Sequence, residues 1–322
     1  MHPPHNPAAP SGPGKMRAIR YGDYGQPPRI EVTPIPLPGP GEVLIRVEAA
    51  AFNPLDVKLH SGQRRWYFDL AFPYTMGSDV AGTIEQVGAG VTGLSVGDPV
   101  IGWLPPLTGG AFAEYAVLSA GVCAARPGGM SAVVGAAIPT AAGTAWQALI
   151  DIAKVERGQT VLVHAGAGGV GGFAIQFAAA RGAHVIATAS GDGVALCRSL
   201  GAHHVIDYRV ADFTKIVADC DVVLDPIGGT TQADSYRVLK RGGHLVSLVE
   251  APEAAMLESF GVTGTRAYFK FESGQLESLI ETVARDRLTV TIDSVVDFSD
   301  FASGLARQAS GRARGKIVLG IS

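Results

Sequence analysis

Short apolar runs separated by glycine and proline fill the first part of the chain, from Met16 to about Ala125. The runs occupy residues 29–38, 42–53, 80–88, 98–104 and 112–119. Runs of this length, bounded by turn residues, are typical of the strands of a compact β-barrel. This part of the chain is therefore expected to form one.

The pattern changes at Ser131, which is a plausible N-cap residue. Residues 131–155 read as two helices of small residues, broken by Pro139. From Gln159 onward, apolar runs alternate with helical patterns, and the runs are apolar on both faces. Strands buried on both faces between helices predict a doubly wound parallel sheet.

The last fifty residues return to the pattern of the first region. A helix is expected near 274–286, a strand within 288–298 and a final strand at 316–321. We predict a discontinuous barrel domain, residues 16–130 and 273–322, with the sheet domain, residues 131–272, inserted into it. Two domains suit a chain of 322 residues.

Composition narrows the class of ligand and the compartment. The net charge of −3, without a long basic run, argues against nucleic acid or an anionic membrane as partner, and favours a small-molecule substrate. No stretch of about 18 apolar residues predicts a membrane helix. The three cysteines lie far apart, and the proline-rich segment 1–15 reads as a disordered tail rather than a signal peptide. A cytoplasmic location is expected.

A glycine motif lies between the first predicted strand of the sheet domain and the helix that follows it. Gly166, Gly168 and Gly171 complete the pattern G-x-G-x-x-G, which in this context predicts a dinucleotide-binding turn. The first glycine permits the turn, the second admits a pyrophosphate and the third allows close packing. Together with Gly169 and Val170, whose amides start the helix, they should bind the phosphates. The alternative is that the glycines serve helix packing alone.

The tip of the second strand should select the cofactor. NAD-binding proteins usually carry a carboxylate there, but this strand ends in Ser190. Ser190 could donate a hydrogen bond to a 2′-phosphate, and Arg198, Tyr208 and Arg209 lie within its reach, so NADP(H) is the predicted cofactor. Asp192 could instead reach a ribose and favour NAD(H), and Arg198 could be a solvated helix residue.

Several further motifs occur in a consistent order. They are AAAFNPLDVKLHSG (49–62), residues 74–100, GGAFAEYAV (109–117), AGAGGVG (165–171), GAHHVIDYR (201–209), DVVLDPIGG (221–229) and GKIVL (315–319). With these motifs the chain resembles the medium-chain dehydrogenase/reductase superfamily, in its zinc-free quinone oxidoreductase branch, the relatives of zeta-crystallin. The resemblance implies an α/β fold with a GroES-like β-barrel catalytic domain plus a Rossmann doubly wound parallel-sheet domain.

The resemblance also allows the residues at the zinc-ligand positions of related enzymes to be compared with those of this chain. Zinc-dependent members of the superfamily have a cysteine, a histidine and a second cysteine where this chain has Asn53, Ser78 and Thr140. Those three residues cannot supply the ligands that Zn²⁺ prefers, even if Asp79 contributed. No metal is therefore expected. His60, near the same cleft, is interpreted as an exposed or satisfied residue on a strand-to-loop segment.

The resemblance implies that the nicotinamide end of the cofactor meets Thr140, Thr144, Leu248, Val249, Phe269 and Lys316. Asn53 is the candidate donor to the developing oxyanion. Asp56 is a second candidate catalytic residue, with local turn chemistry as the alternative. Of the aromatic residues in 66–74, one or two should line the substrate site, and Tyr67 is the candidate hydroxyl.

The expected reaction is hydride transfer from NADPH to a quinone or an α,β-unsaturated carbonyl without metal. Two alternatives remain open: an enoyl-thioester reductase, and a non-catalytic dinucleotide-binding protein with a structural or regulatory role. Residues 265–271 look like an edge strand, and in the family this region joins two subunits. A homodimer is expected.

Overall fold

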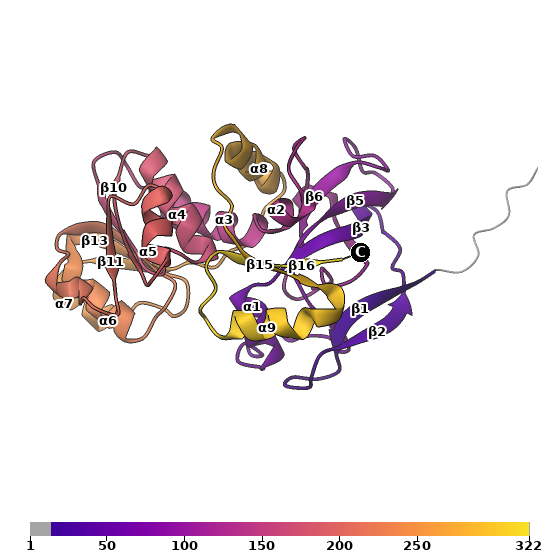
Figure 1. Cartoon of the computed structure of the whole chain (residues 1–322), viewed down its shortest axis with the longest axis horizontal. Coiled ribbons are helices and arrows are strands. Elements are labelled where there is room, and N and C mark those ends of the chain that lie inside the picture. Colours follow the sequence, from indigo (N-terminus) through magenta and orange to yellow (C-terminus); the bar gives the residue numbers. More distant parts are fainter. Residues whose placement is uncertain (1–13, 322) are drawn as a thin grey trace, which may run out of the picture.

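The computed structural model describes residues 14–321, which form two lobes joined side by side (Figure 1). The tail prediction for residues 1–13 lies outside the described residues. Lys15, the last residue of that predicted tail, already belongs to strand β1 (Lys15–Tyr21). β1 pairs with β2 (Arg29–Pro34) and β4 (Tyr74–Thr75) in a small antiparallel sheet.

The larger sheet of the barrel lobe combines both ends of the chain. Its order is β15-β16-β3-β5-β6-β8, and β7 pairs with β3. The C-terminal strand β16 lies antiparallel to β3, with Val318 opposite Ala51. The strands are β3 (Glu42–Ala51), β5 (Asp79–Val87), β6 (Pro99–Trp103), β7 (Tyr115–Ser119), β8 (Cys123–Ala125), β15 (Ile292–Asp297) and β16 (Lys316–Gly320).

The second lobe is a parallel six-stranded sheet of order β11-β10-β9-β12-β13-β14. Its strands are β9 (Thr160–Val163), β10 (His184–Ala189), β11 (His204–Asp207), β12 (Cys220–Asp225), β13 (Leu239–Ser247) and β14 (Thr263–Arg266). The chain runs outward from β9 in one direction and then from β12 in the other. Such a reversal opens a crevice at the carboxyl ends of the strands, where ligands bind. The predicted fold class is confirmed.

Helices cover the sheet and join the lobes. The α-helices are α1 (Pro54–His60), α2 (Ala132–Ala136), α3 (Pro139–Trp146), α4 (Gly169–Ala180), α5 (Gly193–Ser199), α6 (Thr230–Val238), α7 (Ala254–Phe260), α8 (Gln275–Arg285) and α9 (Phe301–Ala309). Short 3₁₀ helices are η1 (Ala120–Val122), η3 (Phe213–Lys215) and η4 (Phe298–Asp300). A π-helix, η2 (Gln147–Ile152), extends α3. Within residues 14–321 no helix is long and apolar enough to cross a bilayer.

The junction between the lobes is built from small residues. Ser131 caps α2, its hydroxyl accepting a hydrogen bond from the Val134 amide, and Pro139 begins α3, as predicted. The alanines of α3 are buried against α4 in a core that also includes Ala51 of the barrel. Small side chains let these backbones approach closely, so one continuous core fixes the barrel against the nucleotide-binding sheet.

Candidate functional site

The glycine motif forms the turn between β9 and α4. A Cβ atom at Gly171 would lie 2.2 Å from the carbonyl oxygen of Ala165, so only glycine fits there. A Cβ at Gly166 would lie 2.9 Å from the Cβ of Ala187. At Gly168 a Cβ would lie 3.2 Å from the carbonyl oxygen of Ala165, which is also a tight contact. All three glycines thus serve close packing of the turn.

The first turn of α4 is suited to a pyrophosphate. Gly168 is its N-cap and offers no side-chain cap. The amides of Gly169, Val170 and Gly171 have no acceptor inside the helix, because the first amides of any helix lack one. Free N–H groups and the positive end of the helix dipole at such a helix start can bind phosphate oxygens.

Ser190, Tyr208, Asp207 and Arg209 form a polar corner at the C-terminal ends of β10 and β11. The Ser190 hydroxyl donates to the Tyr208 hydroxyl oxygen at 3.0 Å. Arg209 donates to both carboxylate oxygens of Asp207, which lowers the pKa of that carboxyl. One Arg209 Nη atom lies 3.5 Å from where a Cβ of Gly191 would stand, so the guanidinium borders the strand tip.

Arg198 makes none of these contacts. It is exposed in the last turn of α5 and makes no hydrogen bond to Ser190, Tyr208 or Arg209. Arg209, which the sequence named together with Arg198, is the cation that borders the strand tip. The signal that could have selected it is its place directly after β11, a strand that neighbours β10 in the sheet.

Asp192, the residue that favoured NAD(H), is engaged by another group. Its carboxylate accepts a hydrogen bond from Arg314 Nη1 at 2.5 Å. Arg314 comes from the barrel side of the molecule, just before β16. The pair offsets the negative charge near the strand tip.

A cavity of about 400 Å³ continues from the end of the glycine loop into the space between the lobes. It brings together seven of the predicted residues: Asn53, Thr140, Thr144, Val170, Leu248, Val249 and Phe269. Its walls also include the aromatic side chains of Phe68, Trp103 and Tyr268. Its mainly apolar and aromatic lining is typical of a small-molecule site.

Behind the cavity lies a buried polar network centred on Lys316. The Lys316 ammonium donates to Phe52 O at 2.8 Å, Asn53 Oδ1 at 2.5 Å and Asp79 Oδ2 at 3.3 Å. Thr140 donates to Asp79 Oδ1 through its amide at 3.0 Å and its hydroxyl at 2.5 Å. Lys316 is 4% exposed and Asp79 is 0% exposed, so this is a fully buried ion pair.

This network corrects two predicted roles. The side-chain amide of Asn53 donates to Asp79 Oδ2 at 3.0 Å and to Ala51 O at 3.4 Å, so both of its hydrogens are directed into the protein. Asn53 thus positions neighbouring groups and does not present a donor to the cavity. Lys316 likewise does not line the cavity; its side chain packs against Gly169, and its ammonium is held in the network.

Asp56 is a buried capping residue of α1. Its Oδ2 accepts a hydrogen bond from the backbone amide of Asn53 at 2.7 Å. This contact is the local turn chemistry that was the alternative to a catalytic role. Burial raises the pKa of Asp56 to about 7, although the hydrogen bond from the Asn53 backbone amide and the charge of Lys316 act to lower it. Asp56 does not line the cavity.

Asp56 should make stability depend on pH. Its pKa is higher in the folded than in the unfolded protein, so the folded state binds more protons between about pH 4 and pH 7. We expect the free energy of unfolding to fall as the pH rises through that window, and to fall less steeply in Asp56→Asn. Urea denaturation between pH 5 and pH 8 measures both slopes. Exposed Asp69→Asn is the control, and equal slopes for Asp56→Asn and wild type would contradict the prediction.

Tyr67 also departs from its predicted place. It is 50% exposed and lies outside the cavity lining, and its hydroxyl oxygen accepts a hydrogen bond from Arg266 Nη1 at 3.0 Å. Of the aromatic residues in 66–74, Phe68 is the one that lines the cavity. One of these aromatic residues therefore lines the cavity, as expected, but it is Phe68 rather than Tyr67.

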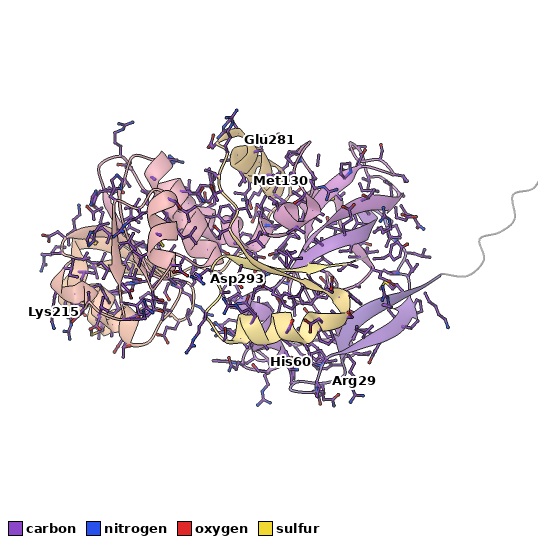
Figure 2. All side chains as sticks on the ribbon, in the orientation of Figure 1. Arg29, His60, Met130, Lys215, Glu281 and Asp293 are labelled. Atoms are coloured by element: carbon purple, nitrogen blue, oxygen red, sulfur yellow. The ribbon has the colours of Figure 1, made fainter. Side chains whose placement is uncertain are left out.

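His60 is a satisfied residue, as expected, but in another setting. It is the last residue of helix α1 rather than part of a strand-to-loop segment (Figure 2). Its Nε2 lies 2.7 Å from Gln26 O, and its ring packs edge-on against Tyr21. Within residues 14–321, no three His, Cys, Asp or Glu side chains group as metal ligands.

Sequence reasoning assigned no ligand-binding role to five polar residues of the cavity, and it considered one of them, Ser78, only as a replaced zinc ligand. The five are Lys58, Arg64, Ser78, Arg266 and Lys270. The Ser78 hydroxyl makes no hydrogen bond to the described residues, so it is free to face a ligand. A helical reading of 54–60 could have indicated Lys58, because α1 places it on the same face as Pro54 and Leu55, one turn earlier.

Comparisons with known proteins agree with this geometry. The family model described as "Alcohol dehydrogenase GroES-like domain" matches residues 39–128, and that described as "Zinc-binding dehydrogenase" matches residues 200–319. A chloroplastic quinone-oxidoreductase homolog from Spinacia oleracea is 33% identical, over 94% of this chain and 98% of its own. The chain belongs to the medium-chain dehydrogenase/reductase superfamily. Its place is in the quinone oxidoreductase branch.

Two further relatives extend the comparison. A 2-methylene-furan-3-one reductase from Solanum lycopersicum is 34% identical, over 95% of this chain and 79% of its own. A mycobacterial protein solved in complex with NADPH is 31% identical, covers 95% of this chain and 99% of its own, and has a TM-score of 0.85. The chain is an oxidoreductase that uses a nicotinamide dinucleotide.

Proposed function

We propose that this protein transfers a hydride from NADPH to a quinone or an α,β-unsaturated carbonyl without a metal ion. The observation that carries the proposal is the buried network of Lys316, Asn53 and Asp79. Through Asp79 the network includes Asn53 and Thr140, two of the three positions that the resemblance aligns with zinc ligands. A Zn²⁺ ion there would lie beside a buried ammonium and find no thiolate or imidazole, so the donor set does not fit it.

The acceptor must then be electrophilic by itself. Without a Lewis acid, a simple alcohol lacks the stabilisation that makes its oxidation easy. A conjugated acceptor spreads the developing negative charge onto an oxygen, and hydrogen-bond donors in a dry cavity suffice to stabilise it. Bound NADPH supplies the hydride. The Ser78 hydroxyl is the donor that we assign to that oxygen, and Trp103 and Phe269 exclude water around it.

Preference for NADPH is supported by the polar corner. Ser190 and Tyr208 provide hydroxyl groups where the 2′-phosphate would lie, and Arg209, which is paired with Asp207, borders them. Asp192 is paired with Arg314, so it adds no unbalanced repulsion. The relative solved with NADPH supports the choice of cofactor, and the relative named 2-methylene-furan-3-one reductase supports the choice of acceptor class.

The test is an acceptor panel. Consumption of NADPH and of NADH is followed against ortho-quinones, para-quinones, enals and enoyl thioesters, beside metal analysis of the purified protein. We expect oxidation of NADPH by quinones or enones. Activity with enoyl thioesters alone would favour the enoyl-thioester reductase, and tight NADPH binding without any turnover would favour a non-catalytic role. Stoichiometric zinc would contradict the metal-free mechanism.

We also propose a cytoplasmic homodimer that recognises neither nucleic acid nor membrane. β14 (Thr263–Arg266) is an edge strand of the six-stranded sheet, and edge strands pair readily with a second copy. Light scattering should then give twice the chain mass of 33.3 kDa, whereas a monomer mass at micromolar concentration would rule out a stable dimer. Cell fractionation tests the compartment.

A further inference from the structure

Four cationic side chains line the substrate cavity. Lys270 is exposed and forms an ion pair with Glu272 at 3.2 Å, and the other three come from three separate segments. Lys58 comes from α1, Arg64 from the loop that follows α1, and Arg266 from the end of β14. All three are half-buried. Residues so far apart in sequence meet here because the two lobes close over the same space.

No carboxylate balances these three cations. The cavity lining in the described part of the chain contains no Asp or Glu, and none of the three residues forms an ion pair there. Arg64 donates to the carbonyl oxygen of Val249 at 3.1 Å, and Arg266 donates to the Tyr67 hydroxyl. Both acceptors are neutral. Arg266 Nε is buried without any hydrogen-bond partner.

Keeping these charges together costs free energy in the absence of an anion. Burial, followed by the positive charges of Arg64 and Arg266, lowers the pKa of Lys58. Partly buried charges are screened less than exposed ones, so the repulsion is not removed by salt. A ligand with a negative charge would remove it and supply the missing hydrogen-bond acceptor.

Arg266 is also held in a fixed position. Its guanidinium lies 5.1 Å from the ring centroids of both Tyr67 and Tyr268, and the two rings stack at 5.7 Å. A guanidinium clamped in this way loses little freedom on binding a ligand. The two tyrosines thus prepare Arg266 to meet an anion at the cavity.

We propose that the electron acceptor carries an anionic group, a carboxylate, sulfonate or phosphate, and that Lys58, Arg64 and Arg266 bind it. This inference rests on the proposed function and narrows its substrate class. The cofactor's own phosphates are assigned elsewhere, to the first turn of α4 and to the corner at Ser190. The three cations, by contrast, come from α1, the loop after it and the end of β14, and none of them is among the residues assigned to the cofactor.

The experiment compares acceptors that differ in charge. The pairs are 4-oxopent-2-enoate with its methyl ester, 1,4-naphthoquinone-2-sulfonate with 1,4-naphthoquinone, and crotonyl-coenzyme A with the crotonyl thioester of N-acetylcysteamine. They separate carboxylate, sulfonate and phosphate as the source of the anion. We expect kcat/KM to favour the anionic member of at least one pair by about 10-fold or more, since hydrogen bonds to charged groups are the strong ones.

Variants identify the residues responsible. Lys58→Met and Arg266→Met should each reduce that preference by about 10-fold, and Arg266→Lys should retain most of it. Arg29→Gln, which removes an exposed cation of β2 far from the cavity, is the matched control (Figure 2). NADPH affinity, measured by fluorescence, should remain within about twofold of wild type.

A binding measurement makes the inference independent of turnover. Calorimetry of levulinate against methyl levulinate, on the protein saturated with NADP⁺, should show tighter binding of the anion and loss of that difference in Lys58→Met. Equal behaviour of charged and neutral ligands in both assays would overturn the inference, as would a loss of NADPH affinity in the variants. Absence of any acceptor reduction, with anion binding intact, would instead count against the proposed reaction.

Discussion

Lys316→Met is expected to lower the free energy of unfolding by about 3–5 kcal/mol, the usual effect of removing one partner from a buried ion pair. The variant leaves Asp79, which is 0% exposed, with a charge that no cation offsets. It also removes the donors to Phe52 O and Asn53 Oδ1, so two buried acceptors lose a partner. Urea denaturation measures the effect.

A double variant separates the lost charge from the lost volume. Lys316→Met combined with Asp79→Asn removes both charges and should recover a substantial part of the stability. Lys215→Met, at an exposed residue on the outer side of the sheet lobe, should change stability by less than about 0.5 kcal/mol (Figure 2). If the single and double variants were equally unstable, the buried charge would not be the cause.

Ser190→Asp is expected to shift the ratio of kcat/KM for NADPH over NADH towards NADH by about 100-fold. The new carboxylate would stand at the tip of β10, where it repels a 2′-phosphate and accepts hydrogen bonds from a ribose. It would also sit beside Arg209 and compete with the phosphate for that cation. Steady-state kinetics with both cofactors and one fixed acceptor give the ratio.

Ser190→Ala is the matched control for the loss of the hydroxyl alone. It removes the hydrogen bond to Tyr208 without adding charge, and should change the ratio by about 10-fold or less. An unchanged ratio in Ser190→Asp would mean that the 2′-phosphate binds away from this corner, and the NADPH preference would need another explanation.

The candidate site was partly predictable. Thr144, Leu248, Val249 and Phe269 were expected at the nicotinamide end, and the structure places all four on one cavity. Asn53 and Lys316 were expected to act on ligands, but they satisfy each other. Sequence position identified the neighbourhood of these groups. It did not indicate their partners, because the direction of a buried side chain depends on every residue packed around it.

Local patterns determined the fold class and the glycine turn to which we assign the cofactor's phosphates. Alternating strands and helices, the three glycines of the motif and the lack of a carboxylate at Ser190 are properties of short segments, so the sequence alone was sufficient for them. Only the tertiary structure brought Lys316 to Asn53 across 263 positions, and Lys58, Arg64 and Arg266 to one cavity. Those contacts arise where two lobes meet, and distances between lobes are set by the packing of the whole core rather than by any local pattern.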